Sequence, residues 1–153
     1  MHRSIVPDII GGKQTLATLT ADVTVRQAAK VMAERHIGAV LITANGRLEG
    51  IFTERDVLNK VVAPGRDPET VTLGEVMTRN PDTVSPDATA LDTLIRMQTK
   101  GYRHVPVVDG GELIGIVSVR DLFNAVKREL EEDIQEREAF IGSSTFQVEL
   151  SAG

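Results

Sequence analysis

Residues 18–37 begin with a short apolar step and continue with a helical pattern. Between Val25 and Ile37 the apolar positions recur at a period near 3.6, so this stretch predicts a helix with one buried face. Thr24 precedes Gln27 by three residues, and this spacing predicts a capping box at the start of the helix. The preceding residues 18–20 are typical of a brief strand.

Residues 39–61 predict a hairpin followed by a second helix. The continuous apolar run 39–42 is typical of a strand covered on both faces. Asn45-Gly46 is the strongest short signal for a hairpin turn, and residues 48–52 return as the partner strand. Thr53 closes that strand and caps a helix that runs to about Val61.

The same pattern returns 65 residues later. Gly50-Ile51-Phe52-Thr53-Glu54-Arg55-Asp56 corresponds without a gap to Gly115-Ile116-Val117-Ser118-Val119-Arg120-Asp121. Further matches at this offset are Thr18/Thr83, Asp22/Asp87, Thr24/Thr89, Met32/Met97, Val40/Val105, Gly46/Gly111, Leu48/Leu113 and Asn59/Asn124. The chain therefore contains an internal duplication. Since one repeat is too short to bury much core alone, we expect the two halves to share one hydrophobic interior.

The second copy predicts its elements in the same order. Residues 87–100 form its first helix, and Gly101 is placed to end that helix in the left-handed conformation. A buried strand at 105–108, a turn at 109–111 and a returning strand at 113–117 follow.

The remaining segments connect or extend the repeats. We expect residues 5–10 to form one helical turn on the first repeat, and residues 72–77 to form a short helix after the loop at 63–68. The predicted division is an N-terminal segment (1–14), repeat 1 (15–62), a linker with a short helix (63–80), repeat 2 (81–126), and a C-terminal helix and tail (127–153).

The last helix is predicted to continue from Asp121 through Glu138. It carries a narrow apolar stripe between charged positions, and such a stripe needs a partner surface, either the body of the protein or another subunit. The stripe consists of Val126, Leu130, Ile134 and Ile141. Residues 143–153 are a polar tail to which we assign no role.

Composition narrows the possible functions. The chain of 153 residues has a formal net charge of -5, which argues against a nucleic-acid partner. It contains no Cys, which excludes disulfides, thiolate metal sites and a cysteine nucleophile. No apolar run is long enough for a membrane span and no signal peptide is evident, so we expect a cytoplasmic protein that does not associate with membranes.

The repeated motif has two interpretations. A hydroxyl at Thr53 or Ser118 with a carboxylate three residues later can simply cap a helix. Alternatively, Asp56 and Asp121 can accept hydrogen bonds from the two hydroxyls of a ribose, while the helix start attracts phosphate. The glycine before each strand end would then allow a ligand to approach the backbone.

The repeat resembles the cystathionine-beta-synthase (CBS) domain. The resemblance rests on the order of elements and on Gly-x-x-Thr/Ser-x-x-Asp before the last helix, supported by Glu75-Val76-Met77-Thr78-Arg79-Asn80-Pro81 and Arg103-His104-Val105-Pro106-Val107-Val108-Asp109. It covers residues 15–126. It implies an α/β (α+β) fold of two tandem β-α-β-β-α repeats related by a pseudo-twofold axis, plus a C-terminal helical extension. It also implies a module that binds adenosyl compounds and often dimerises into a flat disc.

The resemblance assigns roles to the residues of the repeated motif. Asp56 and Asp121 become ribose ligands, and Thr53 and Ser118 contact ribose or phosphate. Arg55 and Arg120 add positive charge at the helix starts, although both can equally be solvated surface residues.

The basic pair Arg103-His104 makes the two predicted clefts unequal, because its counterpart in repeat 1 is Gly38-Ala39. In the family this position often contacts phosphate. We therefore expect a phosphorylated ligand in the cleft formed by Arg103, His104, Ser118 and Asp121. The strands bearing Thr83-Val84 and Val105-Pro106 are expected to provide the adenine slot, a role that remains compatible with core packing.

These observations favour a non-enzymatic, stand-alone regulatory or sensor module for signal transduction. Its expected ligand is AMP, ADP or ATP, with NAD or S-adenosylmethionine as alternatives, and it requires no cofactor or metal. We expect a homodimer and a regulated partner protein. An interaction or assembly protein with unoccupied clefts is the competing hypothesis. An enzyme is disfavoured because no nucleophile-base pair or metal cluster is evident.

Overall fold

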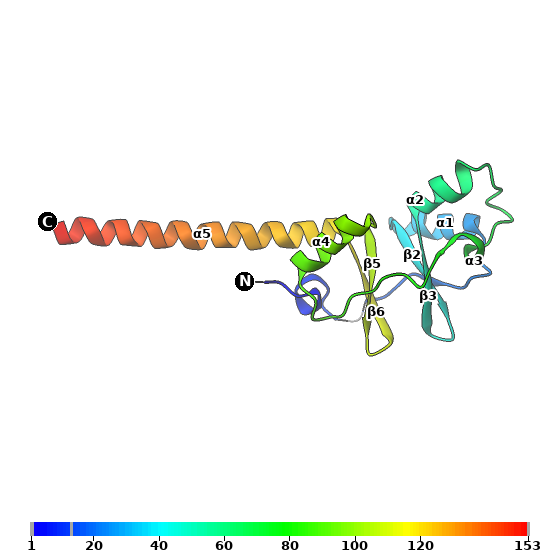
Figure 1. The fold of residues 1–153 in the computed structure, drawn as a ribbon, viewed down its shortest axis with the longest axis horizontal. Helices are drawn as coiled ribbons and strands as arrows, with labels where there is room; N and C mark the ends of the chain where they lie inside the picture. The colour runs from blue at the N-terminus through cyan, green and yellow to red at the C-terminus, as the bar shows by residue number, and fades with distance from the viewer. Residues whose placement is uncertain (1, 13, 153) are drawn as a thin grey trace.

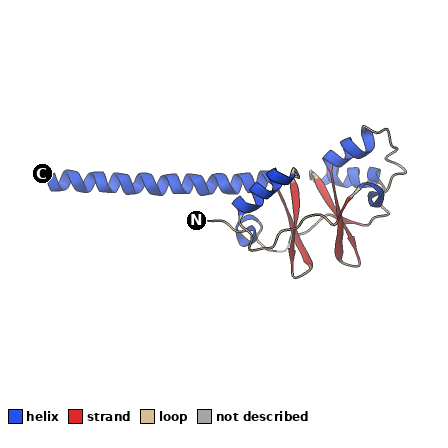
Figure 2. Ribbon diagram, in the orientation of Figure 1, coloured by secondary structure: helices blue, strands red, loops and turns tan. Residues whose placement is uncertain are grey.

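The two repeats form the same elements with bounds shifted by 65 residues (Figures 1 and 2). The structure is a computed structural model that describes residues 2–12 and 14–152, with side chains through residue 142. The equivalent pairs are α1 (Val25–Arg35) and α4 (Ala90–Lys100), β2 (Ala39–Ala44) and β5 (His104–Asp109), and β3 (Arg47–Thr53) and β6 (Glu112–Ser118). Both hairpins have a register shift at the same place, between Ile42 and Thr43 and between Val107 and Val108. The predicted fold class is thus confirmed.

Repeat 1 is built on a sheet with strand order β1-β2-β3-β4. β1 (Thr18–Leu19) pairs in parallel with β2, and β4 (Thr78–Arg79) from the linker pairs antiparallel with β3. α2 (Glu54–Asp56) continues directly into the wider helical segment η2 (Val57–Val62). The short helix α3 (Leu73–Val76) begins at a capping box of Thr72 and Glu75.

Repeat 2 repeats this topology with fewer paired residues. β5 and β6 form its sheet. In place of a strand equivalent to β1, Val84 makes a single parallel bridge to Val107. Gln14 occupies the outer side of β6, because its backbone N–H donates to the Ile114 carbonyl oxygen and its side chain accepts from Ile116.

The predicted turns and helix caps are present. Asn45 and Gly46 both have positive φ in the first hairpin, as do Gly110 and Gly111 in the second. Gly101 ends α4 in the left-handed conformation with φ of 83°.

The apolar interior differs from the single shared core that the sequence predicted. Each repeat has its own cluster, centred on Phe52 in repeat 1 and on Val105 in repeat 2. A third and smaller cluster joins the two sheets through Ala39, Leu41, Ile51 and Leu113. The reason is geometric: each sheet is covered by its own helices on one side, and only the other side faces the second repeat.

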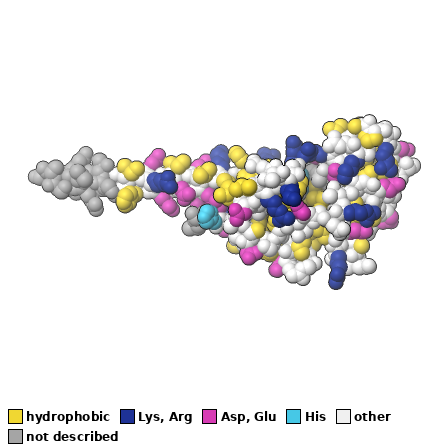
Figure 3. Space-filling view, viewed as in Figure 1, with side chains coloured by type: hydrophobic (Ala, Val, Ile, Leu, Met, Phe, Trp, Pro, Cys, Tyr) yellow, Lys and Arg dark blue, Asp and Glu magenta, His cyan; other side chains and the backbone are white. Residues whose placement is uncertain are grey.

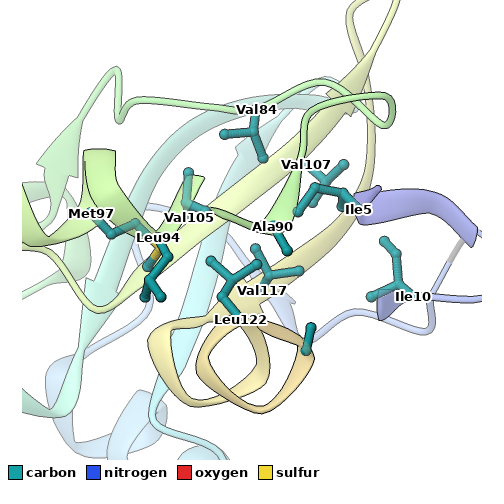
Figure 4. Packing of buried hydrophobic residues seen from close by; sticks show 11 residues of the cluster. Ile5, Ile10, Val84, Ala90, Leu94, Met97, Val105, Val107, Val117 and Leu122 are labelled. Carbon is teal, nitrogen blue, oxygen red and sulfur yellow. The ribbon is translucent and has the colours of Figure 1, made fainter. Parts of the chain in front are cut away.

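The N-terminal segment packs on repeat 2, so its predicted place on repeat 1 is wrong. Ile5, in η1 (Ile5–Ile9), and Ile10 belong to the cluster of repeat 2, where the Ile5 side chain lies beside Val107 (Figure 4). The Ile5 backbone N–H donates to the Ala88 carbonyl oxygen at 2.9 Å. The apolar pattern correctly indicated burial but could not indicate which repeat provides the surface.

The last helix is longer than predicted. α5 extends from Val119 to Ala152 as one rod that projects away from both repeats (Figure 1). The backbone of the predicted polar tail is therefore helical up to Ala152, while Gly153 and the tail side chains lie outside the described part of the structure. Among the described residues, no helix has both the length and the apolar character needed to cross a bilayer.

Candidate ligand site

Two clefts lie between the repeats, and they are lined by largely equivalent positions. The first cleft, of about 480 Å³, is lined by Ile51, Thr53, Glu54, Arg55, Asp56, Asn59, Thr78, Asn80, Pro81, Asp82, Lys100, Gly101, Tyr102, Arg103 and His104. The second cleft, of about 420 Å³, is lined by Gln14, Thr15, Leu16, Ala17, Arg35, His36, Ile37, Gly38, Ala39, Leu41, His104, Ile116, Val117, Ser118 and Asp121. Both volumes lie in the range of small-molecule sites.

The motif of repeat 1 caps a helix at the wall of the first cleft. The Thr53 backbone N–H donates to Asp56 Oδ2 at 2.9 Å, and the Asp56 backbone N–H donates to Thr53 Oγ1 at 3.3 Å. Lys60 Nζ lies 3.4 Å from the other carboxylate oxygen, Asp56 Oδ1. Capping therefore occurs, and it fixes the carboxylate at the edge of the cleft.

The motif of repeat 2 does the same at the second cleft. The Ser118 backbone N–H donates to Asp121 Oδ2 at 3.0 Å, and the Asp121 backbone N–H donates to Ser118 Oγ at 3.1 Å. Within the described part of the chain, no cation lies within ion-pair distance of Asp121, and Ala125 occupies the position equivalent to Lys60. This second capping box is also the start of the projecting helix α5.

The structure separates the four residues that the sequence grouped into one site. His104, Ser118 and Asp121 line the second cleft together, whereas Arg103 lines the first cleft with Thr53 and Asp56. Arg103 and Ser118 meet only in a wide central groove, to which Arg120 and Gly38 also contribute. Arg103 lies just before β5, whereas His104 is the first residue of this strand and lines both clefts, so adjacent residues at the start of β5 have different surroundings.

His104 is the side chain shared by both clefts and the central groove. Its Nδ1 is buried without a hydrogen-bond partner. Burial lowers the pKa of His104 below its ordinary value, and the nearby carboxylates of Glu54 and Asp121 oppose this effect. A Cβ atom placed on Gly38 would lie 3.3 Å from the His104 ring and 3.2 Å from the Glu54 carboxylate, so the glycine leaves room for both.

The acidic residues of the first cleft are partly neutralised by cations from outside its lining. Asp82 Oδ2 lies 3.6 Å from Arg96 and accepts a 3.1 Å hydrogen bond from the Tyr102 hydroxyl. Burial, and to a lesser extent this bond, raises the pKa of Tyr102. Lys60 likewise offsets the negative charge of Asp56. The lining cations Arg55, Lys100 and Arg103 therefore give the first cleft an excess of positive charge.

Arg55 connects the two repeats as well as lining the first cleft. Its guanidinium donates to the carbonyl oxygen of Gly101 at 3.1 Å, which ties the start of α2 to the end of α4. The solvated arginine that the sequence also allowed therefore has a specific contact across the cleft. Its equivalent, Arg120, lies in the central groove.

The motif glycines serve packing in this structure. A Cβ atom on Gly50 would lie 2.5 Å from the Met77 sulfur, and one on Gly115 would lie 2.5 Å from the Ile10 side chain. Neither glycine lines the two clefts. The close approach that the sequence attributed to a ligand is thus made by the segments preceding each repeat.

The predicted adenine slot is also corrected. Val84 and Val105 belong to the core of repeat 2, Pro106 is buried, and none of the three lines either cleft. Thr83 lies in a separate hollow near the hairpin tips. The Val84 backbone N–H donates to the Pro106 carbonyl oxygen at 3.0 Å, so this strand edge is closed by the protein itself.

Sequence reasoning missed several residues of the first cleft, notably Asn80, Pro81, Lys100 and Tyr102. Their signal was available in the duplication, because the residues 65 positions earlier, at 15, 16, 35 and 37, line the second cleft. Equivalent positions that frame both clefts are the ones most directly placed to contact a ligand. Within the described part of the chain, no cluster of His, Asp and Glu is arranged to hold a metal ion.

The fold and its paired clefts define a tandem-repeat module in which two sheets face each other across equivalent cavities. Residues 6–63 and 73–128 each match the CBS domain family, and the chain belongs to that family. Among curated relatives, it is 38% identical over 113 residues to the Arabidopsis thaliana CBS domain-containing protein CBSCBSPB2 and 35% identical over 127 residues to the mitochondrial CBSX3 of the same plant. These matches cover 72% and 80% of this chain but only 21% and 62% of the relatives.

Solved structures show the same architecture. A putative signal-transduction protein with CBS domains from Burkholderia ambifaria superposes with a TM-score of 0.74 at 33% identity, covering 82% of this chain and 93% of that one. A CBS domain protein from Pyrobaculum aerophilum complexed with AMP has a TM-score of 0.65 at 29% identity, covering 71% and 84%. The CBS domain pair of protein MJ0100, in complex with 5′-methylthioadenosine and S-adenosyl-L-methionine, has a TM-score of 0.72 at 25% identity, covering 84% and 99%.

Proposed function

We propose that this chain is a regulatory module that binds an adenine nucleotide between its two CBS repeats, with the first cleft as the principal site. The observation that carries the proposal is the set of groups in that cleft: the Asp56 carboxylate, the aromatic Tyr102 and cations that both repeats contribute. Family relatives complexed with AMP or with S-adenosyl-L-methionine support an adenosyl ligand.

Each part of a nucleotide has a complementary group in the first cleft. Ile51, Pro81 and Tyr102 provide the apolar and aromatic surface that an adenine ring requires. Asp56 Oδ1 faces Lys60 without a backbone partner and is suited to accept the ribose hydroxyls. The helix that starts after Thr53 directs the positive end of its dipole toward a phosphate.

The charges favour the first cleft for a phosphorylated ligand. Arg103 and Lys100 approach it from repeat 2, and Arg55 approaches it from repeat 1, so a phosphate held there would contact both halves. The second cleft has Arg35 in the position of Lys100 but Gly38 in that of Arg103. We infer that it takes a less charged adenosyl compound or remains empty.

Binding across both repeats provides a route to regulation. A ligand changes the arrangement of two parts only if it binds one arrangement more tightly than the other. A nucleotide that bridges Arg55 and Arg103 meets this condition, because it binds most tightly at one angle between the repeats. The proposal includes no catalytic step. A homodimer, a regulated partner protein and a cytoplasmic location stay predictions.

Isothermal titration with AMP, ADP, ATP, NAD and S-adenosylmethionine tests the proposal. We expect at least one nucleotide to bind, and Asp56→Ala to weaken it about 100-fold through the loss of hydrogen bonds to a charged group. Asp121→Ala is the matched control, because it removes the equivalent capping carboxylate, and we expect its effect on that ligand to be below about 3-fold.

Three other outcomes would contradict the proposal. The absence of binding by all five compounds would favour an interaction protein with empty clefts. Turnover of a nucleotide would indicate an enzyme. A larger loss in Asp121→Ala than in Asp56→Ala would move the principal site to the second cleft. Thermal unfolding of both variants establishes that each remains folded.

A further inference from the structure

The projecting part of α5 exposes apolar side chains that form one line along the helix. Phe123, Leu130, Ile134 and Ile141 are 58%, 58%, 54% and 63% exposed. Their successive spacings of seven, four and seven residues return to the same side of a helix within roughly 20° per heptad. We call these four residues the α5 stripe. Hydrophobic side chains are visible between charged ones along the rod in Figure 3.

The α5 stripe does not continue the contact between α5 and its own repeat. The side of α5 that packs on repeat 2 carries Leu122, Ala125 and Glu129, all of which are buried. At 3.6 residues per turn this buried side lies roughly a third of a turn from the stripe. From residue 134 to residue 142 every position is exposed, so the body of the protein does not cover the stripe there.

A solvated helix of this kind needs a covered face. Helices in water obtain most of their stability from the packing of an amphipathic side, and an uncovered apolar line weakens that contribution. The stripe extends over about 27 Å between Phe123 and Ile141, given 1.5 Å of rise per residue. A seam of this length suits another helix.

The charges around the stripe favour a second copy of the same helix. Lys127 and Arg137 interrupt the stripe, whereas Glu131 and Glu138 border one side of it and Asp133 borders the other. In a pair of such helices, the cations in the seam of one copy reach the flanking carboxylates of the other. These acidic borders also disfavour an anionic lipid surface or a nucleic acid as the occupant.

We propose that the α5 stripe is a self-association surface, through which two copies of this chain pair their projecting helices as a short coiled coil. Phe123 lies in repeat 2, but Leu130, Ile134 and Ile141 lie on the rod beyond the repeats, so most of this surface is separate from the flat disc that the family resemblance implies. It also does not depend on the nucleotide site, and it can be tested without any ligand.

Single-cysteine cross-linking provides a direct test, because the chain contains no cysteine. Under mild oxidation we expect Ile134→Cys to form a disulfide dimer if the helices are parallel. If they are antiparallel with the dimer axis near residue 132, a mixture of Leu130→Cys and Ile134→Cys should form the mixed dimer, since these two residues then face each other. Either product supports the proposal. Ala139→Cys is the control, because residue 139 lies on the side of α5 away from the stripe.

Two cross-linking results would overturn the proposal. One is the absence of disulfide dimers from all the stripe variants at concentrations where the chain is dimeric. The other is cross-linking of Ala139→Cys at the same rate as the stripe variants, which would indicate random collision. Unmodified circular dichroism spectra establish that each variant retains its helices.

Two substitutions that each add a negative charge provide a second, independent measurement. Ile134→Glu and Gln135→Glu each add one negative charge at neighbouring exposed positions of α5. We expect Ile134→Glu to weaken association measured by sedimentation equilibrium by at least about 10-fold and to reduce helicity at 222 nm, because a seam position becomes charged. Gln135→Glu should change association by less than about 2-fold. Equal effects of the two substitutions would refute a role for the stripe.

Discussion

The two clefts share a backbone frame but not a chemical character. Helix starts, strand starts and hairpins superimpose by a shift of 65 residues, and both motif aspartates cap the helix that follows. The side chains that line the clefts differ: Tyr102, Arg103, His104 and Lys60 in or beside the first cleft replace Ile37, Gly38, Ala39 and Ala125. The two clefts therefore have a similar backbone shape but are lined by different side chains.

The largest expected difference between the clefts comes from the aromatic ring. Tyr102→Ala should weaken nucleotide binding about 10- to 100-fold, since base stacking contributes roughly 1–3 kcal/mol. Ile37→Ala, at the equivalent position, should change the same affinity by less than about 2-fold. Titration calorimetry measures both. Tyr102→Phe retains the ring and loses only the bond to Asp82, so we expect near-normal affinity. A loss in Tyr102→Phe as large as in Tyr102→Ala would contradict a stacking role.

The next difference concerns two arginines, one just before β5 in the first cleft and one at the end of α1 in the second cleft. Arg103→Ala should reduce affinity for ATP about 10-fold, because one charge-assisted contact to phosphate disappears. Arg35→Ala in the second cleft should reduce it by less than about 2-fold. The salt dependence of binding provides the check: it should be weaker for Arg103→Ala than for the unmodified chain. Equal salt dependence in Arg103→Ala and Arg35→Ala would indicate that the phosphate does not contact Arg103.

Removal of either helix cap should lower the stability of the protein by a similar amount, but the two removals should differ in their effect on nucleotide binding. Thr53→Ala and Ser118→Ala each remove a side-chain cap, and each should lower the free energy of unfolding by about 1 kcal/mol. Denaturant unfolding measures this loss. Only Thr53→Ala should also weaken nucleotide binding, by a few-fold, since its hydroxyl lines the first cleft. Equal losses of affinity would indicate that both clefts bind the nucleotide.

The smallest expected effect involves His104, which both clefts share. Burial lowers the pKa of His104 below its ordinary value, which favours the neutral ring when no ligand is bound. A phosphate nearby stabilises the protonated ring, so affinity should rise by up to about 3-fold as pH falls from 7.5 to 6. His104→Gln should remove this difference, as measured by titration at several pH values. A pH profile unchanged by the substitution would exclude His104 from phosphate binding.

The same lowered pKa sets the sign of a stability effect. Well above pH 6.5 the ring is neutral in both the folded and the unfolded chain, so it contributes no pH dependence there. As the pH falls through 6.5, the unfolded chain binds the proton more readily than the folded chain, so the free energy of unfolding decreases as the pH is lowered. The unfolding free energy of His104→Gln should therefore decline less than that of the unmodified chain between pH 6.5 and 5.

The local sequence was sufficient to predict much of the fold. The Asn45-Gly46 turn, the Gly101 helix end and the capping boxes at Thr24 and Thr53 all depend on interactions within a few residues. Such signals can be recognised without knowing the partner surfaces. The equivalence of the repeats then extended each assignment to a second region.

Predictions that depended on partners across the fold were less successful. The amphipathic pattern at Ile5 and Ile10 requires burial but is satisfied by either repeat, and tertiary packing selects repeat 2. Val84 and Val105 could be assigned to a slot or to a core, and closure of the strand edge by Val84 places both in the core. Residues missed in the first cleft, such as Tyr102, lack a local motif that distinguishes them from other loop residues.

The sequence by itself determined the duplication, the order and type of the elements, and the two motif aspartates at helix starts. These features follow from periodicity and from contacts over a few residues. Only the tertiary structure decided that Arg103 lines the cleft of Thr53 and Asp56, and that His104 stands between both clefts. The physical reason is that residues 103 and 104 lie where the two repeats meet, so the cleft that each side chain lines depends on how the two sheets pack against each other.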